Sequence, residues 1–288
     1  MNRFLEQVRS LEPGTSLAVL GDPIAHSLSP VMHDAALAAR GLAHRYGRLR
    51  VSETELAEAF RYLHDRFLGW NLTLPLKLAA VNLVDEIDAE ARWLNAINTV
   101  VCRQGRLAGF NTDSAGLHRA LDEAFGAGWN LAPVTIIGAG GGAGSSAARY
   151  LARIGVPELV LVNRTPEKLE PLRAALAGLT NLRLHGWDGL PRAVAESRLL
   201  INASSLGLDG APLGWDPGWL QSDHRVFDMV YRRDPTPVVA WARSRGTVAA
   251  DGLAMLLYQG AAAFRHWFGE PVPEAEMRRA LYAAAGRA

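Results

Sequence analysis

The chain has 288 residues, 49% of them hydrophobic, and a formal net charge of +1 at pH 7. This length exceeds that of a typical single domain and predicts two, each with enough apolar residues for a core. The balanced charge gives no electrostatic footprint for nucleic acid, and the sequence has neither an apolar run long enough to cross a membrane nor a signal peptide. The single cysteine, Cys102, cannot close an internal disulfide, so we expect a soluble cytoplasmic protein.

The titratable residues indicate no metal site, because the eight histidines lack a metal-binding spacing. Of the thirty basic residues only Lys77 and Lys168 are lysines. Arginine stays protonated in proteins whereas an amine can lose its proton, so a lysine kept in such a chain is a candidate for acid/base chemistry. With only two cases, chance retention is the alternative.

The N-terminal part begins with a short helix, expected over about the first fifteen residues, and a strand over 16–21. Ser29 is a good N-cap and Pro30 a good first helical residue, so a helix is predicted over 30–40. Ser27 has no such capping role. Two hydroxyl groups beside a helix N-terminus also suit a substrate carboxylate.

A further strand is expected over 67–77, with Asn71 and Thr73 on one face because alternate residues of a strand point the same way. Pro75 would end the strand and Lys77 would begin a helix. The helix dipole disfavours a cation there, and no acidic residue lies within four positions. Lys77 is therefore a candidate general acid or base, and an ordinary solvent-exposed lysine is the alternative.

A β-hairpin is expected over 98–113, with its turn at 104–105. It would deliver Asp113 to the start of a helix that continues over 117–127. Capping that helix is the simplest role for Asp113.

The stretch 134–155 has the pattern of a strand, a glycine-rich turn and a helix start. Gly138, Gly140 and Ala143 fit G-x-G-x-x-G/A, which allows a tight turn, a close approach of the backbone to a pyrophosphate, and close packing of strand and helix. The helix N-terminus offers N–H groups and a partial positive charge to phosphates. By itself a glycine turn is weak evidence, since glycine also simply makes turns.

The next strand, expected over 158–165, reaches Asn163 where an NAD site would place an acid for the ribose 2′-hydroxyl. No acid is present. Arg164 and Lys168 instead offer a guanidinium and an ammonium that suit a 2′-phosphate. These residues predict NADP(H) rather than NAD(H), and an ordinary solvated helix start is the alternative.

The rest of the chain alternates apolar strands with helices, which predicts a doubly wound parallel sheet. The loop after Ala203 would lie at the carboxyl end of a strand, where ligands bind in such sheets. The expected strands are 182–185, 198–204 and 225–231, and the expected helices are 235–245, 253–268 and about 273–285.

Seven ordered motifs, spread over nearly the whole chain, resemble the shikimate dehydrogenase family. G-x-P-I-x-H-S-x-S-P resembles the motif whose two serines hold the shikimate carboxylate, and N-x-T-x-P-x-K the segment with the catalytic lysine and a substrate-binding threonine. A-I-N-T and G-x-N-T-D resemble segments whose Asn and Asp bind substrate hydroxyls, with the Asp paired to the lysine. The resemblance implies two catalytic residues, Lys77 and Asp113. The substrate-binding residues that it implies are Ser27, Ser29, Asn71, Thr73, Asn98, Asp113, Tyr231 and Gln259.

The other motifs resemble the family's cofactor segments. N-R-T-x-x-K looks like its NADP phosphate clip, and D-M-V-Y and G-x-x-M-x-x-x-Q-G-A resemble segments that touch the nicotinamide and close the substrate site. The implied fold is α/β, with a substrate-binding domain over 1–114, joined by C-terminal helices in 252–288, and a Rossmann-like, doubly wound NADP-binding domain over 115–251. The implied cofactor-binding residues are Gly138, Ala139, Gly140, Gly141, Gly142, Ala143, Asn163, Arg164, Thr165, Lys168, Ala203, Ser204, Met229, Gly252 and Met255.

The resemblance implies NADPH-dependent reduction of 3-dehydroshikimate to shikimate, a step of aromatic amino-acid biosynthesis, by a monomer or homodimer. Two rivals are a quinate/shikimate dehydrogenase that uses NAD, against which Arg164 argues, and a non-catalytic NADPH-binding sensor, against which Lys77 and Asp113 argue. Positions that depart from the family pattern are Asp34, Asn95, Gly144, Ser204 and the pair Arg232-Arg233, and none removes a proposed catalytic group.

Overall fold

The computed structural model describes residues 3–204, 206, 214 and 216–287, which form two compact units. Unit 1 combines Met1–Gly116 with Leu256–Ala288, and unit 2 is Leu117–Met255. The sequence predicts domain limits after residues 114 and 251, two and four residues before the limits of these units.

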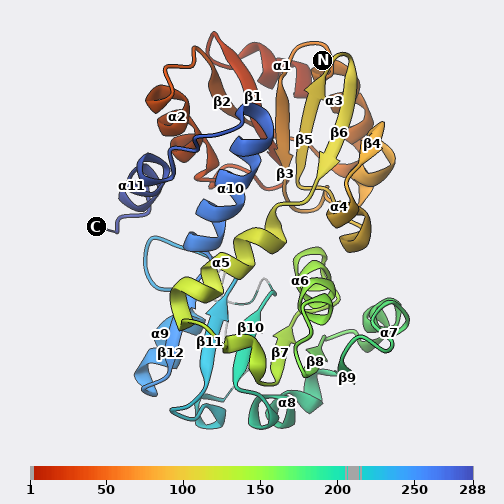
Figure 1. Cartoon of the computed structure of the whole chain (residues 1–288), viewed down its shortest axis with the longest axis vertical. Coiled ribbons are helices and arrows are strands. Elements are labelled where there is room, and N and C mark those ends of the chain that lie inside the picture. The colour runs from red at the N-terminus through yellow and green to blue at the C-terminus, as the bar shows by residue number, and fades with distance from the viewer. Residues whose placement is uncertain (1–2, 205, 207–213, 215, 288) are drawn as a thin grey trace. The chain divides into compact units, whose positions relative to one another are not determined.

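The chain passes from one unit to the other inside two helices, α5 (Asp113–Phe125) and α10 (Leu253–Phe268). Both are amphipathic segments in which a helix was expected, and α10 has the predicted bounds. Each unit therefore receives one end of each helix (Figure 1).

Unit 1 contains a mixed sheet of six strands within its described residues. The strands are β1 (Thr15–Gly21), β2 (Arg45–Arg50), β3 (Gly69–Leu72), β4 (Glu86–Ile87), β5 (Thr99–Arg103) and β6 (Arg106–Phe110). Their order is β2-β1-β3-β5-β6-β4, and β5 is antiparallel to both β3 and β6. The helices of this unit, besides its parts of α5 and α10, are α1 (Arg3–Arg9), α2 (Ser29–Ala39), α3 (Leu56–Leu63), α4 (Ala89–Leu94) and α11 (Glu274–Ala284).

This topology brings segments that are distant in sequence to one edge of the sheet, the edge formed by the carboxyl ends of β1, β3 and β6. Because β1, β3 and β6 run in the same direction, the segments that follow Gly21, Leu72 and Phe110 all leave the sheet at that edge. The antiparallel β5 begins there, at Thr99. Residues 27–29, 73–77, 98 and 111–113 therefore come from segments that meet at the same edge.

The predicted hairpin is confirmed. β5 and β6 are joined by Gln104 and Gly105, whose φ angles of 52° and 70° fit the two-residue turn that matches the twist of paired strands. The first helix is shorter than predicted, because α1 ends at Arg9 and the chain turns at Gly14, where φ is +86°. Phe4 in α1 is fully buried and anchors this helix to the core.

Unit 2 contains a parallel sheet of six strands within its described residues (Figure 1). The strands are β7 (Val134–Ile137), β8 (Glu158–Val162), β9 (Asn181–His185), β10 (Leu199–Asn202), β11 (Arg225–Asp228) and β12 (Val248–Asp251). The order β12-β11-β10-β7-β8-β9 confirms the predicted doubly wound fold. The helices, besides its parts of α5 and α10, are α6 (Gly142–Arg153), α7 (Glu170–Ala175), α8 (Leu190–Glu196) and α9 (Pro237–Ser244).

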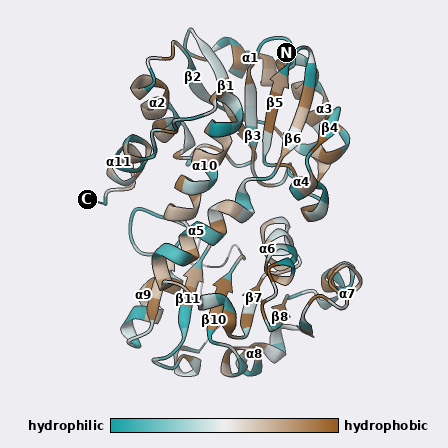
Figure 2. Ribbon diagram, in the orientation of Figure 1, coloured by the Kyte–Doolittle hydropathy of each residue, from teal (hydrophilic) through white to brown (hydrophobic). Residues whose placement is uncertain are grey.

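The centre of the unit 2 sheet is apolar. All four residues of β7 and all four of β10 are buried, and Figure 2 shows hydrophobic colour on both strands. A sheet with helices on both faces requires such strands. The winding reverses between β7 and β10, and ligands of open α/β sheets bind outside the carboxyl ends of the strands at this point.

Three edge strands, β2, the two-residue β4 and β12, are missing from the elements expected from the sequence. In β2 the exposed Arg45, Arg48 and Arg50 surround the buried Tyr46 and Leu49. The apolar signal of this strand is therefore weak, and arginines on an edge strand also discourage pairing with another sheet. The short β12 is half alanine, which has a low strand propensity.

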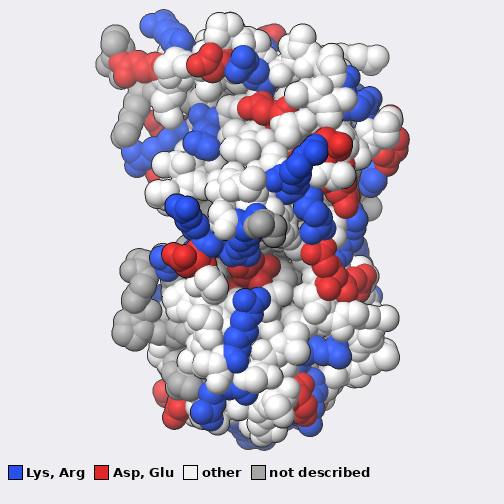
Figure 3. All heavy atoms as spheres, turned by 90° about the vertical axis from the view of Figure 1, so that its left-hand side faces the viewer, with Lys and Arg blue, Asp and Glu red and all other residues white. Residues whose placement is uncertain are grey.

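The described surface carries charges of both signs. Figure 3 shows basic and acidic side chains interspersed on one face, in keeping with the net charge of +1. Within the described residues, no helix combines the length and the apolar character needed to span a bilayer.

Candidate active site

Lys77 lies in a turn after β3, not at the start of an α-helix as predicted. The strand ends at Leu72, before Pro75 where its end was predicted, and the chain turns at Pro75, which has no N–H for a strand ladder. A short 3-10 helix follows at Ala79–Asn82. The Lys77 carbonyl accepts a hydrogen bond from the Ile97 N–H (2.9 Å), which fixes the turn beside the start of β5.

The Lys77 ammonium contacts the Asp113 carboxylate. Nζ of Lys77 lies 2.5 Å from Oδ2 of Asp113, and the two side chains are only 20% and 12% exposed. The acid that is missing near Lys77 in sequence thus comes from the first turn of α5, 36 residues later. The alternative of an ordinary solvent-exposed Lys77 is therefore wrong.

Asp113 does not cap α5 with its side chain. Its own N–H donates to Oδ1 of Asn111 (2.9 Å), whose Nδ2 donates to the carbonyl of Ala96 (2.9 Å). Asn111 therefore fulfils the local role that we expected for Asp113. Its signal in the sequence was an Asn two residues before the helix start, a common turn residue. Both carboxylate oxygens of Asp113 serve other partners.

Asn98 is the buried centre of this site. Its Nδ2 donates to Oδ1 of Asp113 (2.9 Å) and to Oγ1 of Thr112 (3.0 Å), while its Oδ1 accepts the Thr112 N–H (2.9 Å). Gln259, from α10, places Oε1 3.5 Å from the same Nδ2. The structure thus brings Lys77, Asp113, Asn98 and Gln259 into one cluster, although they come from four segments.

Ser27 and Ser29 lie together before and at the start of α2. The helix begins at Ser29, one residue earlier than predicted, and Leu28 in the N-cap position provides no side-chain hydrogen bond. Ser29 is therefore not the cap. Oγ of Ser27 accepts the Ser29 N–H (3.3 Å) and lies 3.2 Å from the Ser29 Oγ, which makes a pair of adjacent hydroxyl groups.

Thr73 and Asn71 differ in their surroundings. A Cβ atom at Gly21 would lie 2.4 Å from Cγ2 of Thr73, so the glycine makes room for this threonine. Asn71 is only 5% exposed, and both of its Nδ2 hydrogens are directed at protein atoms, the Asn98 carbonyl and Oγ1 of Thr99 (3.0 Å each).

The glycine turn after β7 approaches its neighbours closely. Gly138 has φ of +83°, and a Cβ there would lie 2.8 Å from Cβ of Ser204. At Gly140 a Cβ would lie 2.7 Å from Cβ of Lys168. At Gly144 it would lie 2.5 Å from the Gly138 carbonyl oxygen. Gly144, one residue after Ala143, is therefore a further position that must be small for helix and strand to pack.

The predicted phosphate clip lies beside this turn. Oδ1 of Asn163 accepts the Gly140 N–H (3.3 Å), and its Nδ2 donates to the Thr165 carbonyl (2.8 Å). Arg164, Thr165 and Lys168 are exposed, and neither cation has an ion-pair partner among the residues the structure describes. Two free cations next to a glycine turn and the N-terminus of α6 fit the phosphates of NADP.

The carboxyl ends of β10, β11 and β12 are linked to this turn. Ser204 Oγ donates to Oδ1 of Asn202 (2.6 Å), whose Nδ2 donates to Oδ1 of Asp228 (2.9 Å). A Cβ at Gly252 would lie 2.3 Å from the Met229 carbonyl oxygen. The remaining predicted residues at this edge are Ala203, Tyr231 and Met255, and the rest of the loop predicted after Ala203 lies outside the described residues apart from Leu206.

The sequence did not single out Asn202 or Asp228, although Asp228 begins the D-M-V-Y motif. Asp228 is fully buried, and burial raises the pKa of its carboxyl to about 6 against the hydrogen bonds of Thr236, Val230 and Asn202. Its Oδ1 accepts from both the Asn202 Nδ2 (2.9 Å) and the Val230 N–H (3.1 Å). The only sign in the sequence was a polar residue at the end of each of two apolar strands.

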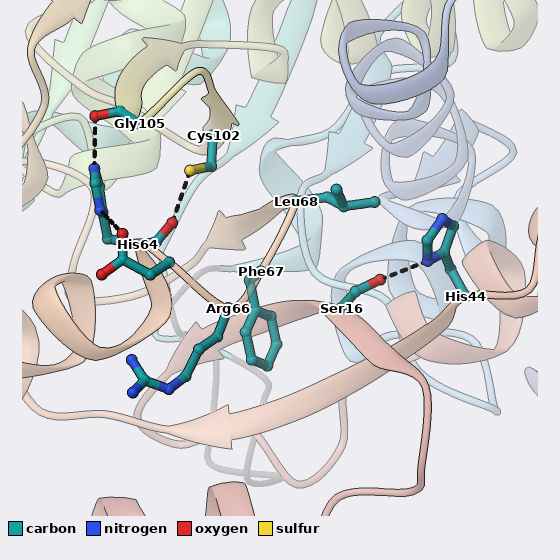
Figure 4. A pocket seen from close by; sticks show the side chains of 9 residues that line it. Ser16, His44, His64, Arg66, Phe67, Leu68, Cys102 and Gly105 are labelled. Atoms are coloured by element: carbon teal, nitrogen blue, oxygen red, sulfur yellow. Dashed lines mark hydrogen bonds and ion pairs between the residues drawn. The ribbon is translucent and has the colours of Figure 1, made fainter.

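A pocket in unit 1 lies at the other edge of the sheet (Figure 4). Its lining includes residues at the starts of β1 and β3. Its polar groups contact one another: Ser16 Oγ lies 3.0 Å from His44 Nδ1, and the two ring nitrogens of His64 contact Asp65 and the Gly105 carbonyl. Cys102 donates to the His64 carbonyl, and burial raises the pKa of its thiol. Within the described chain, no three His, Cys, Asp or Glu side chains gather as metal ligands would.

Comparison with known proteins covers nearly the whole chain. Residues 19–100 match the shikimate dehydrogenase substrate-binding domain, and 252–282 match the shikimate 5′-dehydrogenase C-terminal domain. The shikimate dehydrogenase (NADP(+)) of Methanothrix thermoacetophila is 43% identical over 94% of this chain and 97% of its own length.

Solved structures agree with this assignment. The shikimate 5-dehydrogenase of Thermus thermophilus in complex with NADP(H) and shikimate is 36% identical, with a TM-score of 0.82 over 93% of this chain and 98% of that one. Quinate dehydrogenase from Corynebacterium glutamicum in complex with NAD is 29% identical, with a TM-score of 0.82 over 93% and 99%. The α/β fold of two units, the ordered motifs and these similarities together show that the chain belongs to the shikimate dehydrogenase family.

Proposed function

We propose that this chain catalyses the reversible, NADP(H)-dependent reduction of 3-dehydroshikimate to shikimate, with Lys77 as general acid and base and Asp113 as its partner. The observation that carries the proposal is the contact of 2.5 Å between Lys77 and Asp113 in a site that Asn98 and Gln259 complete. The relatives that carry the name shikimate dehydrogenase (NADP(+)) match nearly the whole chain.

Lys77 has the chemistry that carbonyl reduction needs. When bound, NADPH supplies the hydride, and the alkoxide that develops on the substrate must receive a proton. The Lys77 ammonium can donate that proton, and the amine can take it back in the oxidation. Asp113 holds the ammonium in place and can accept a hydrogen bond from a ring hydroxyl of the substrate.

The other polar residues of unit 1 suit the remaining groups of the substrate. The adjacent hydroxyls of Ser27 and Ser29, at the N-terminus of α2, provide donors for a carboxylate. Thr73, Asn98 and Gln259 offer hydrogen bonds to ring hydroxyls. The family resemblance also implies a substrate-binding role for Tyr231, a residue of unit 2.

The proposed preference for NADP(H) over NAD(H) rests on the phosphate clip at 163–168. Arg164 and Lys168 would hold a 2′-phosphate, and the N–H groups at the start of α6 would hold the pyrophosphate. A quinate dehydrogenase that uses NAD is the rival, favoured by the likeness to the Corynebacterium glutamicum structure. The absence of an acid at Asn163 argues against NAD as the preferred cofactor.

The location and assembly belong to the same proposal. A cytoplasmic enzyme without nucleic-acid or membrane partners follows from the balanced charge and the single cysteine. We infer a monomer or homodimer, and sedimentation equilibrium of the purified chain distinguishes the two.

A spectrophotometric comparison tests the function. Purified protein is assayed at 340 nm with NADP⁺ and NAD⁺, each with shikimate and with quinate. The expected order places NADP⁺ with shikimate first by kcat/KM. A preference for NAD⁺ would contradict the assignment of NADP(H) as cofactor. Efficient oxidation of quinate would contradict the assignment of shikimate as substrate. No turnover with any pair would contradict the proposal that the protein is a dehydrogenase.

A further inference from the structure

A buried chain of polar side chains leads from Tyr46 in β2, through residues of β3 and β5, to Asp113. The Tyr46 hydroxyl donates to Oδ1 of Asn71 (2.6 Å), and Nδ2 of Asn71 donates to Oγ1 of Thr99 (3.0 Å). The Thr99 hydroxyl donates to Oδ1 of Asn98 (2.9 Å). Nδ2 of Asn98 then donates to Oδ1 of Asp113 (2.9 Å). We call Tyr46, Asn71, Thr99 and Asn98 the polar chain.

The direction of these hydrogen bonds is fixed by backbone groups at two points. The Asn98 carbonyl can only accept, so the amide nitrogen of Asn71 faces it (3.0 Å). The Thr112 N–H can only donate, so the amide oxygen of Asn98 faces it (2.9 Å). Because these contacts decide which way each amide points, the polar chain presents an N–H to Asp113 and never an acceptor.

Tyr46 is a rigid donor at the start of the polar chain. Its ring stacks on His33, with centroids 4.4 Å apart, and lies 6.1 Å from that of Trp267. Its N–H donates to Oδ1 of Asp34 (2.8 Å). Burial raises the pKa of Tyr46 well above its ordinary value and lowers the pKa of His33 to about 3, so the phenol keeps its proton and the imidazole stays neutral.

We propose that Tyr46, Asn71 and Thr99 are positioning residues that hold the Asn98 amide against one oxygen of Asp113 and so reserve the other oxygen for Lys77. This inference rests on the roles proposed above for Lys77 and Asp113. It also changes the role of Asn71, which acts through Thr99 and Asn98 rather than by touching the substrate.

Two variants remove single hydroxyl groups from the polar chain. Thr99→Val keeps the shape of the side chain, and Tyr46→Phe deletes one oxygen atom. Since a buried hydrogen bond contributes about 1 kcal/mol, we expect kcat to fall about fivefold in Thr99→Val and about threefold in Tyr46→Phe. KM for NADP⁺ should not change.

The matched control is Tyr62→Phe, which deletes the same oxygen elsewhere in unit 1. The Tyr62 ring packs edge-on against Phe4, and Arg66 lies over it, outside the polar chain. This variant should keep the wild-type kcat and the wild-type KM for NADP⁺. Thermal unfolding and NADPH binding confirm that each variant is folded, and Tyr46→Phe carries the test if Thr99→Val does not fold.

A double-mutant cycle separates positioning from general destabilisation. If the polar chain acts through Asp113, Thr99→Val causes no further loss of kcat once Asp113→Asn is present. An equal loss in both backgrounds would overturn the inference. So would wild-type rates in both Thr99→Val and Tyr46→Phe while Asp113→Asn is impaired. Full activity of Asp113→Asn itself would instead overturn the proposed roles of Lys77 and Asp113.

Discussion

The two units present their functional residues in different ways. In unit 2 the glycine turn at 138–144 and the clip at 163–168 are short continuous segments, each beside the end of one strand. In unit 1 Lys77, Asn98 and Asp113 come from three separate segments that meet at one sheet edge. The difference teaches that the proposed cofactor-binding residues depend on local backbone, whereas the proposed acid/base pair depends on the topology of a whole sheet.

Replacing Lys77 tests the unit 1 side of the comparison and has the largest expected effect. Lys77→Ala removes the proton donor, and a positioned acid or base contributes about a hundredfold to ten-thousandfold in rate. We expect kcat to fall by that factor while the NADPH dissociation constant, measured by fluorescence, changes little because the cofactor segments lie in unit 2. A parallel loss of NADPH affinity would contradict this separation.

Replacing Arg164 is the corresponding test in unit 2. Arg164→Ala removes a charge-assisted hydrogen bond to the 2′-phosphate, which contributes about 1.5–3 kcal/mol. KM for NADP⁺ should therefore rise about 10- to 150-fold, and KM for NAD⁺ should stay the same. The control is Arg173→Ala, because Arg173 is also exposed and pairs with Glu170. An equal loss with both cofactors in Arg164→Ala would show that the residue does not contact the 2′-phosphate.

Alanine substitutions in the glycine turn should have a smaller effect than Lys77→Ala or Arg164→Ala, and the effect should be on stability. A Cβ at Gly144 would lie 2.5 Å from the Gly138 carbonyl oxygen, whereas a Cβ at Gly142 meets nothing within 4 Å. We expect Gly144→Ala to lower the free energy of unfolding by about 1–3 kcal/mol because backbone must move. Gly142→Ala should be neutral or stabilising by up to about 1 kcal/mol, since alanine is the better helix former. Urea unfolding of both variants measures the difference, and equal stabilities would contradict it.

The sequence predicted the elements of unit 2 best. Apolar strands such as β7, β8 and β10 have a strong pattern because both faces of the sheet are covered. The sequence did not predict β2, because three exposed arginines in this edge strand leave only a weak apolar pattern. The end of β3 was also missed, since alternation continues past Leu72 although the ladder stops there.

The site residues follow the same division. A contiguous motif was enough to indicate Arg164 and Lys168. No local pattern showed that Asp113 lies beside Lys77, and only the family resemblance implied it. The polar chain was beyond sequence reasoning, because Tyr46 and Thr99 reach Asn98 through contacts between β2, β3 and β5. The spacing of these residues along the chain contains no sign of those contacts.

Asp228 extends the comparison to pH and has the smallest expected effect. Its pKa is raised from 3.8 to about 6 in the folded protein, so the folded state binds more protons than the unfolded state between these values. Its contribution to stability is therefore largest below pH 4 and is lost as the pH rises through 6. Asp228→Asn keeps an oxygen that can accept from Asn202 and Val230 but carries no charge.

Asp228→Asn should thus raise the free energy of unfolding at pH 8 by about 1–2 kcal/mol relative to wild type, and by less at pH 5. Urea unfolding across this range measures the change, with the exposed Asp188→Asn as the control. A variant that is less stable than wild type at pH 8 would show that the carboxylate is needed in its ionised form to hold β10 and β11 together. Because Asp228 lies in unit 2, the stability of unit 1 should not follow the same pH dependence.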